Sequence, residues 1–191
     1  MDFSKKQIAT FYIEKNKGVL YTTNSTAPFV VQFPQDVIDN LDVVDKSKFQ
    51  QLLSNFIAKS ELKPMHVFVV LSRSVTLEKE LKDIPLSLQS AETEKFLDMV
   101  LFHQILTKTY NFSSKTIIVA ANRDLCENIV SVFQENLFPV IGIIPLSILE
   151  EKFSVVKEKF DEKFVLKKIE NLKQYFLPLG LGEPEKILTY N

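Results

Sequence analysis

The chain has 191 residues, of which 46% are hydrophobic and 25% are charged, and its formal net charge at pH 7 is −1. These values are typical of a soluble globular protein of one domain or two tightly joined subdomains, and they lack the basic footprint that nucleic-acid binding requires. With four glycines and one cysteine, the chain has little material for glycine-rich phosphate loops and cannot form an internal disulfide, which suits a reducing compartment.

No signal-peptide pattern opens the sequence, and no apolar run reaches the length of about 18 residues that a membrane span needs. We therefore expect a cytoplasmic protein. A location at the inner face of a membrane stays open, because the chain would then be the cytosolic domain of a membrane-anchored assembly protein whose apolar segment follows residue 191.

The first part of the chain is predicted to be a β meander followed by a helix. The segments "QIATFYIE" and "GVLYTT" are β-rich and flank a hairpin-like turn at residues 15–18, and "PFVVQFP" is a third strand bounded by prolines. Residues 46–60 carry apolar side chains at i, i+3, i+4, i+7 and i+8, which indicates an amphipathic helix.

The next segments predict core strands and a second helix. "HVFVVLS" (66–72) is almost continuously apolar and indicates a strand buried on both faces, whereas the alternation in "SVTLEKEL" (74–81) indicates a half-buried strand. Ser90 is predicted to cap a helix over residues 91–109 that is apolar around most of its circumference.

The clearest pattern in the chain is a strand–helix–strand over residues 115–145. The strand 115–121, the helix 123–136 and the strand 139–145 are predicted to form a right-handed crossover unit. Between the first strand and the helix lies Asn122-Arg123-Asp124, where many enzymes hold a phosphate. Here the turn has no glycine, and Asn122 and Asp124 are favoured helix-start residues, so capping is the preferred interpretation. Arg123 is left to contact a neighbour or a partner.

A long charged helix is predicted over residues 147–176, with apolar side chains every three to five positions. A helix of about 30 residues measures about 45 Å and would exceed the width of the preceding body. Two interpretations stay open: the stripe docks on its own chain, or part of it contacts a partner protein or a second copy in a homodimer. The stripe residues assigned to partner binding are Phe153, Val156, Phe160, Phe164, Ile169 and Leu172.

Catalytic and metal-binding patterns are sparse. The two histidines, His66 and His103, have no second ligand at metal-binding spacing, so we expect no metal and no cofactor. Cys126 lies near a predicted helix start, which can activate a thiol, but a buried and inert cysteine is the commoner case. Ser72-Arg73-Ser74 joins two strands and is more typical of a plain turn than of an anion site.

The order of the segments from "VFVVLSRSVTLEKEL" to "KTIIVAANRDLCENIVSVFQENLFPVIGIIPLSIL" resembles the actin-like pilus-assembly proteins of the PilM type. It is similar also to the cell-division protein FtsA and the type II secretion protein GspL. "VAA" before a charged helix start, and "FPVIGI" before a helix, match the rhythm of the small subdomain in that family. The resemblance covers about residues 66–149.

The departures from the family pattern concern the nucleotide site. The first phosphate loop of the family would fall at residues 12–18, but "YIEKNKG" lacks its glycine and serines, and the half that would carry the second loop is absent from the sequence. The resemblance thus implies a pseudo-ATPase: an α/β fold with a mixed actin-like or ribonuclease-H-like sheet, first half only, with a small strand–helix–strand subdomain and a long C-terminal helix.

We therefore expect a non-catalytic scaffold or assembly protein that resembles a reduced component of type IV pilus or type II secretion machinery and binds other protein subunits. The alternative is a small α/β hydrolase or transferase that uses Ser72, Arg73 or Cys126. The expected division is 1–89 for the meander, first helix and core strands, 90–145 for the small α/β subdomain, 146–177 for the long helix and 178–191 for a flexible tail.

Overall fold

The computed structural model describes residues 8–22, 27–39, 41–82, 84–153 and 171–179. The strands in these ranges are β1 (Ile8–Glu14), β2 (Lys17–Tyr21), β3 (Phe29–Gln32), β4 (Ile38–Asp39), β5 (Asp42–Val43), β6 (His66–Leu71), β7 (Thr76–Leu81), β8 (Ile105–Asn111), β9 (Thr116–Asn122) and β10 (Val140–Pro145). The helices are α1 (Lys46–Lys59), α2 (Leu86–Asp98), α3 (Arg123–Glu135), α4 (Leu146–Phe153) and a 3-10 turn at Lys173–Tyr175.

The larger sheet has five strands in the order β10-β6-β1-β2-β3. β1, β2 and β3 form an antiparallel meander, whereas β6 runs parallel to β1 and β10 runs parallel to β6. This combination of order and direction is that of a ribonuclease-H-like sheet, from which each half of an actin-like fold is built. The predicted fold class, an α/β protein with a mixed sheet of this type, is confirmed.

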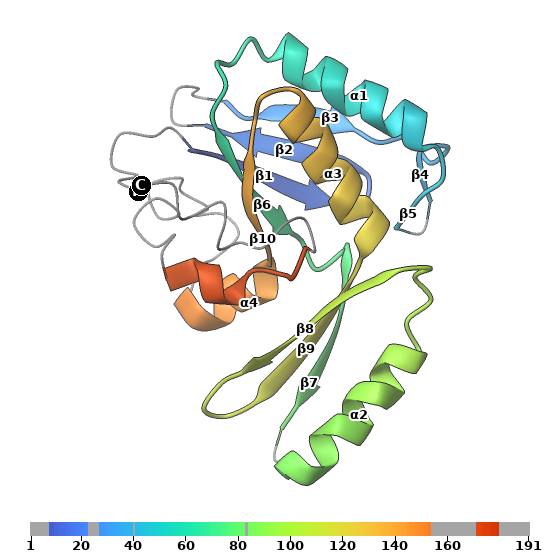
Figure 1. The fold of residues 1–191 in the computed structure, drawn as a ribbon, viewed down its shortest axis with the longest axis vertical. Helices are drawn as coiled ribbons and strands as arrows, with labels where there is room; N and C mark the ends of the chain where they lie inside the picture. Colours follow the sequence, from blue (N-terminus) through green and yellow to red (C-terminus); the bar gives the residue numbers. More distant parts are fainter. Residues whose placement is uncertain (1–7, 23–26, 40, 83, 154–170, 180–191) are drawn as a thin grey trace.

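Helices cover the larger sheet on both faces (Figure 1). α1 and α3 lie on one face, where Phe11 of β1, Phe49 of α1 and Phe133 of α3 are fully buried in one apolar cluster. The rings of Phe11 and Phe133 meet edge to face, with their centroids 5.0 Å apart. α4 lies on the other face, over a second cluster that includes Phe68 and Ile144. The strands between these clusters are therefore buried on both sides, as the apolar run of β6 indicates.

A smaller antiparallel sheet, with the order β7-β9-β8, extends from the main body and carries α2 on one face (Figure 1). Its own core includes Leu81, Phe96, Ile118 and Ala120. In chain order, this small subdomain is inserted between β6 and α3. It contains the succession strand, helix and strand in β7, α2 and β8.

The helix predicted over 91–109 is wrong in its second half. α2 begins at Leu86, directly after Pro85, and ends at Asp98, and residues 105–111 form β8. Pairing with β9 decides this, because β8 contributes one complete antiparallel ladder to the small sheet. Threonines in β8, which favour strands, are consistent with the same result. Such a ladder depends on tertiary partners that the local apolar pattern does not reveal.

The crossover unit predicted over 115–145 is also wrong, although its three segments form as predicted. β9 pairs with β7 and β8 in the small sheet, whereas β10 pairs with β6 in the larger one. α3 thus leads the chain back from the small sheet to the main body. The true parallel crossover runs from β6 to β10, with the whole small subdomain inside the connection.

The single straight helix predicted over 147–176 does not fit the positions of its two ends. The rings of Phe153 and Tyr175 lie 6.2 Å apart, whereas 22 residues of straight helix would separate them by about 33 Å. Residues 154–170 and 180–191 lie outside the described residues, and so does most of the segment 178–191 that was predicted to be a flexible tail. Residues 172–177, which we call the C-terminal strap, pack beside α4 (Figure 1). Of the helices within the described ranges, none combines the length and apolarity that crossing a bilayer would require.

Candidate functional site

The carboxyl ends of the parallel strands meet at one edge of the larger sheet. β1 ends at Glu14, Ser72 follows β6, and Ser147 follows β10 at the start of α4. In open α/β sheets, ligands bind outside this edge.

The two serines that follow β6 are bonded to each other and to the β1–β2 hairpin. The hydroxyls of Ser72 and Ser74 lie 2.7 Å apart, and the backbone N–H of Lys15 donates to Ser74 Oγ over 3.1 Å. Ser72 is 4% exposed, and its backbone N–H donates to the carbonyl of Ile13 over 3.0 Å. The hydroxyls therefore fix the hairpin against the turn that follows β6.

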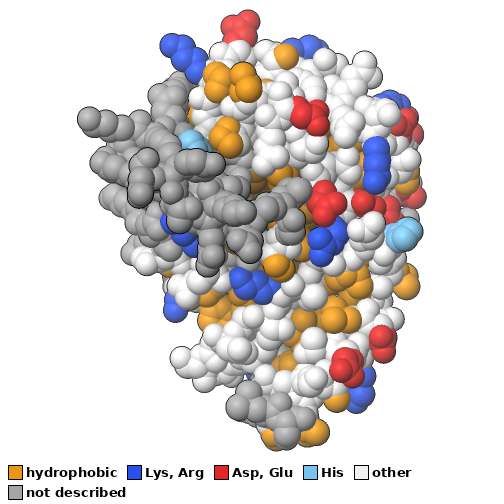
Figure 2. Space-filling model, viewed as in Figure 1, with side chains coloured by type: hydrophobic (Ala, Val, Ile, Leu, Met, Phe, Trp, Pro, Cys, Tyr) orange, Lys and Arg blue, Asp and Glu red, His pale blue; other side chains and the backbone are white. Residues whose placement is uncertain are grey.

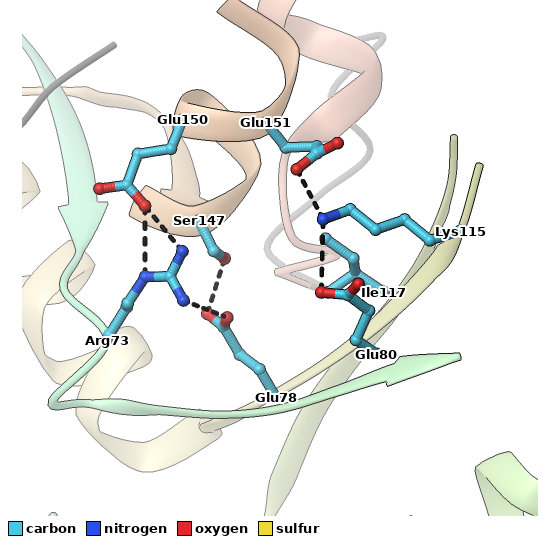
Figure 3. Close-up of a pocket in the computed structure, with 8 residues that line it drawn as sticks. All are labelled: Arg73, Glu78, Glu80, Lys115, Ile117, Ser147, Glu150 and Glu151. Atoms are coloured by element: carbon cyan, nitrogen blue, oxygen red, sulfur yellow. Dashed lines mark hydrogen bonds and ion pairs between the residues drawn. The ribbon is translucent and has the colours of Figure 1, made fainter. Parts of the chain in front are cut away.

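A polar pocket of about 320 Å³ lies beside this edge, between the small sheet and α4 (Figure 3). Charged side chains from both parts of the molecule point into it. Its lining residues are Arg73, Glu78, Glu80, Lys115, Ile117, Ser147, Glu150 and Glu151.

Ion pairs and hydrogen bonds cross the pocket (Figure 3). Arg73 donates from Nε and Nη2 to one carboxylate oxygen of Glu150, over 3.2 and 2.8 Å. Ser147 Oγ donates to Glu78 over 2.7 Å. Lys115 Nζ lies 3.3 Å from a carboxylate oxygen of Glu80 and 2.8 Å from one of Glu151. These contacts attach β7, the β6–β7 turn and the residue that precedes β9 to α4.

The charge of the pocket disfavours anionic ligands. Four carboxylates face one guanidinium and one ammonium group, so a phosphate entering the pocket would meet net repulsion. The hydrogen bond to Glu150 raises the pKa of Arg73, and the one to Glu151 raises the pKa of Lys115. Both cations therefore stay charged and paired near neutral pH. Among the described residues, no group of three acidic, histidine or cysteine side chains is arranged to hold a metal ion.

The turn at residues 122–124 starts a helix, as predicted. Asn122 is the N-cap of α3, and its Oδ1 accepts the backbone N–H of Leu125 over 3.1 Å. Its side-chain amide also donates to the carboxylate of Asp42. Asp124 lies in the first turn of α3, 3.2 Å from Lys46 Nζ. These side chains are thus occupied in joining α3 to α1 and β5.

The other candidates for chemistry are separated in space or buried. Cys126 is completely buried, and this burial raises its pKa to about 12, so the thiol is protonated at neutral pH. His66 begins β6, whereas His103 lies in the exposed connection between α2 and β8, not on the helix predicted there. Arg73, in the charged pocket, is bound to Glu150.

The predicted partner-binding residues have different surroundings. Phe153 and Leu172 both belong to the second apolar cluster, and Leu172 is fully buried there. Arg123 is partly exposed and lies 3.4 Å from a carboxylate oxygen of Glu127. Val156, Phe160, Phe164 and Ile169 lie outside the described residues. The two ends of the predicted apolar stripe therefore dock on their own chain.

The site that holds the C-terminal strap was not predicted from the sequence. Lys108 of β8 donates to the carbonyls of Gln174 and Phe176 over 2.6 and 2.7 Å. The hydroxyl of Tyr110 donates to the carbonyl of Tyr175 over 2.9 Å. Burial lowers the pKa of Lys108 and raises that of Tyr110. The partners in these bonds are more than 60 residues apart in the sequence, so no local pattern indicated them.

Three of the exposed apolar side chains belong to the small subdomain, at the start of α2 and just after its end. Leu101 is 92% exposed, Met99 65% and Leu88 55%. Figure 2 shows hydrophobic side chains on the surface of the lower part of the molecule, where Figure 1 places the small sheet and α2. Exposed apolar side chains are common on protein-binding surfaces.

No protein-family model matches the chain, and no curated protein matches its sequence. Among solved structures, the cytoplasmic domain of EpsL, an inner-membrane component of the type II secretion system of Vibrio cholerae, is similar at 10% identity and a TM-score of 0.47, over 73% of this chain and 57% of its own. A PilM-PilN type IV pilus biogenesis complex is similar at 10% identity and a TM-score of 0.47, over 71% of this chain and 46% of the other.

A Bacteroides thetaiotaomicron protein with an actin-like ATPase fold and unknown function is similar at 12% identity and a TM-score of 0.45, over 81% of this chain and 58% of its own. The matched part of this chain thus spans about half the length of each of these three structures.

Proposed function

We propose that this chain is a non-catalytic assembly or scaffold protein of the reduced actin-like type, which binds a protein partner through its small subdomain. Its place would be at the cytoplasmic side of pilus or secretion machinery, as the sequence resemblance to PilM-type proteins implies. The observation that carries this proposal concerns the carboxyl-terminal edge of the parallel strands, where an actin-like protein would bind nucleotide. That edge is occupied by serine–backbone bonds, and the pocket beside it is lined by four carboxylates and two cations.

Nucleotide binding is tested by thermal unfolding in the presence of millimolar Mg·ATP. A nucleotide at 100 times its dissociation constant would stabilise the protein by about 2.7 kcal/mol and raise its Tm by several degrees. We expect a shift of less than about 1 °C, because the pocket repels phosphate and no glycine-rich loop opens its backbone to a phosphate. The paired variant Glu78→Gln/Glu80→Gln, which removes two of the four carboxylates, controls for charge. A clear shift in the unmodified protein would contradict the loss of nucleotide binding.

Partner binding is tested on the exposed side chains of the small subdomain. We expect Leu101→Asp to reduce capture of the partner at least tenfold, because it places a charge on the most exposed of these apolar side chains. Leu137→Asp is the matched control. Leu137 is also an exposed leucine, with 68% of its surface accessible, but it lies on the main body after α3. Both variants should unfold at the temperature of the parent protein. Equal loss of capture in both variants, or loss in neither, would remove the small subdomain from the proposal.

The second candidate, a small α/β hydrolase or transferase, rests on the serine–arginine turn and on Cys126. The geometry gives it less support. Ser72 is buried and bonded to Ser74, and neither histidine is among the lining residues of the charged pocket. The buried Cys126 would have to lose its proton in an apolar environment. A nucleophile normally needs an adjacent base or a lowered pKa, and these groups have neither in the described part of the chain.

A further inference from the structure

The strand β3 forms one edge of the larger sheet, on the side opposite β10. In the antiparallel ladder with β2, Val19 lies opposite Val30 and Lys17 opposite Gln32. The next residue, Phe33, donates its backbone N–H to the carbonyl of Asn16 over 2.7 Å. Because the direction of backbone groups alternates along a strand, the N–H and C=O groups of Val30 and Gln32 point away from β2, towards the free edge.

Between Pro28 and Pro34, this edge carries no charged side chain. The sequence of β3 is FVVQ, with Val30 50% exposed and Gln32 also exposed. No other strand within the described residues pairs with β3 on its outer side. Natural sheets usually protect such an edge with lysine, proline or a bulge. Pro28 and Pro34 bound β3 and have no N–H to donate, so the outward N–H groups that an added strand can use are those of Val30 and Gln32.

A groove of about 390 Å³ runs along β3 and is bounded by α1. Phe29 and Val31 form its floor on the strand side, and Leu52 and Phe56 form its wall on α1. Among the described residues that line the groove, Lys59 alone carries a charge. An added strand would lie about 4.8 Å from β3, with every second side chain entering this groove and the others lying beside Val30.

We propose that the β3 edge and this groove, together the β3 groove, bind an extended segment of a partner protein by strand addition. The segment has apolar residues at alternate positions, to fill the space between Phe29 and Phe56, and an acidic residue opposite Lys59. An extended segment fits because the groups that need partners belong to the backbone of Val30 and Gln32. A helix has already bonded its own backbone and cannot supply those partners.

The β3 groove is a separate surface from the partner-binding surface proposed on α2. It lies on the main body, whereas Leu101 and Met99 lie on the small subdomain (Figure 1). A failure of either surface can therefore be recognised independently, because Leu101→Asp should leave binding at the β3 groove unchanged. Two such surfaces on one chain are what a scaffold that joins two proteins requires.

The probe is a random library of twelve-residue peptides, displayed and selected against the whole purified chain. We expect enriched peptides in which apolar residues alternate and an acidic residue recurs at one fixed position. Their binding should be at least tenfold weaker to Val30→Pro, which removes the outward N–H, and within twofold of the parent for Val30→Thr, which keeps it. Hydrogen exchange should show that a bound peptide protects the amides of Val30 and Gln32.

A second pair of variants keeps the test valid if Val30→Pro disturbs the sheet. Lys59→Glu should weaken the acidic peptides at least tenfold. Lys63→Glu, which changes an exposed lysine beyond the end of α1 and outside the groove, should not. The proposal is overturned if the selection enriches no peptide, if the enriched peptides bind Val30→Pro and Val30→Thr equally, or if both lysine variants have the same effect.

Discussion

Replacing Asn122 with aspartate is expected to lower the free energy of unfolding by about 3 kcal/mol at pH 7, the size of effect seen when a buried charge loses its partner. Asn122 is 2% exposed, and its side-chain amide donates to the carboxylate of Asp42. An aspartate can still accept the N–H of Leu125, but it faces Asp42 with a second negative charge. Urea unfolding at pH 7 measures the loss.

The matched variant is Asn122→Ser, which keeps a good N-cap and removes only the hydrogen bond to Asp42. We expect it to cost about 1 kcal/mol. The swapped double variant Asn122→Asp/Asp42→Asn should recover most of the loss, because it restores one carboxylate and one amide at the same two positions. If Asn122→Asp and Asn122→Ser are equally stable at pH 7, the bond between α3 and β5 does not contribute as the structure indicates.

The same substitution has a pH dependence with a definite sign. The neighbouring charge and burial raise the pKa of the introduced aspartate in the folded state above its unfolded value of about 3.9. The difference in stability from Asn122→Ser should therefore be small at about pH 4, grow as the pH rises through the folded pKa, and then stay constant. An unchanged difference between pH 4 and pH 7 would show that the two side chains do not interact.

Replacing Gly142 with alanine is expected to lower the free energy of unfolding by about 2 kcal/mol, as overpacking of an apolar contact typically does. A Cβ atom on Gly142 would lie 2.3 Å from the ring of Phe176. That ring lies 5.7 Å from the ring of Phe68, measured between centroids. Because Phe176 is only partly buried, the ring can move outwards, so we expect release of the C-terminal strap, not collapse of the sheet.

Hydrogen exchange locates this effect. The backbone N–H of Leu177 donates to the carbonyl of Ile143 over 2.9 Å, and it should exchange faster in Gly142→Ala while the amides of β6 stay protected. The control is the same substitution in a Phe176→Ala background, where the added methyl group meets no ring. There we expect it to be close to neutral, which a double-mutant cycle measures. Equal costs in both backgrounds would mean that Gly142 does not make room for the strap.

Local signals in the sequence predicted several elements correctly because neighbouring residues alone determine them. The amphipathic stripe of α1, the continuous apolar run of β6, and Asn122 as a helix cap are such cases. Each depends on contacts within about four residues or on burial that the apolar pattern already implies. The preference for capping over phosphate binding at residues 122–124 also depended only on which residue types occupy the turn.

The missed features all depend on contacts between distant segments. The apolar residues of 105–111 fit a helix as well as a strand, and the ladder with β9 decided between them. The strap site joins Lys108 and Tyr110 to carbonyls more than 60 residues away in sequence. The charged pocket brings Arg73 of the β6–β7 turn to Glu150 of α4, 77 residues later. Such contacts between distant segments leave no periodic pattern in the local sequence.

The sequence by itself determined the class of the fold, the buried strands of the main sheet and the start of α3, since hydrophobic periodicity and capping act over short stretches of chain. The tertiary structure alone decided that β9 and β10 belong to different sheets and that the chain returns to bring Tyr175 beside Phe153. It also decided that Ser72 and Ser74 lie against the β1–β2 hairpin. The physical reason is that strand pairing and ion pairing gain their free energy from whichever segments the whole fold brings together.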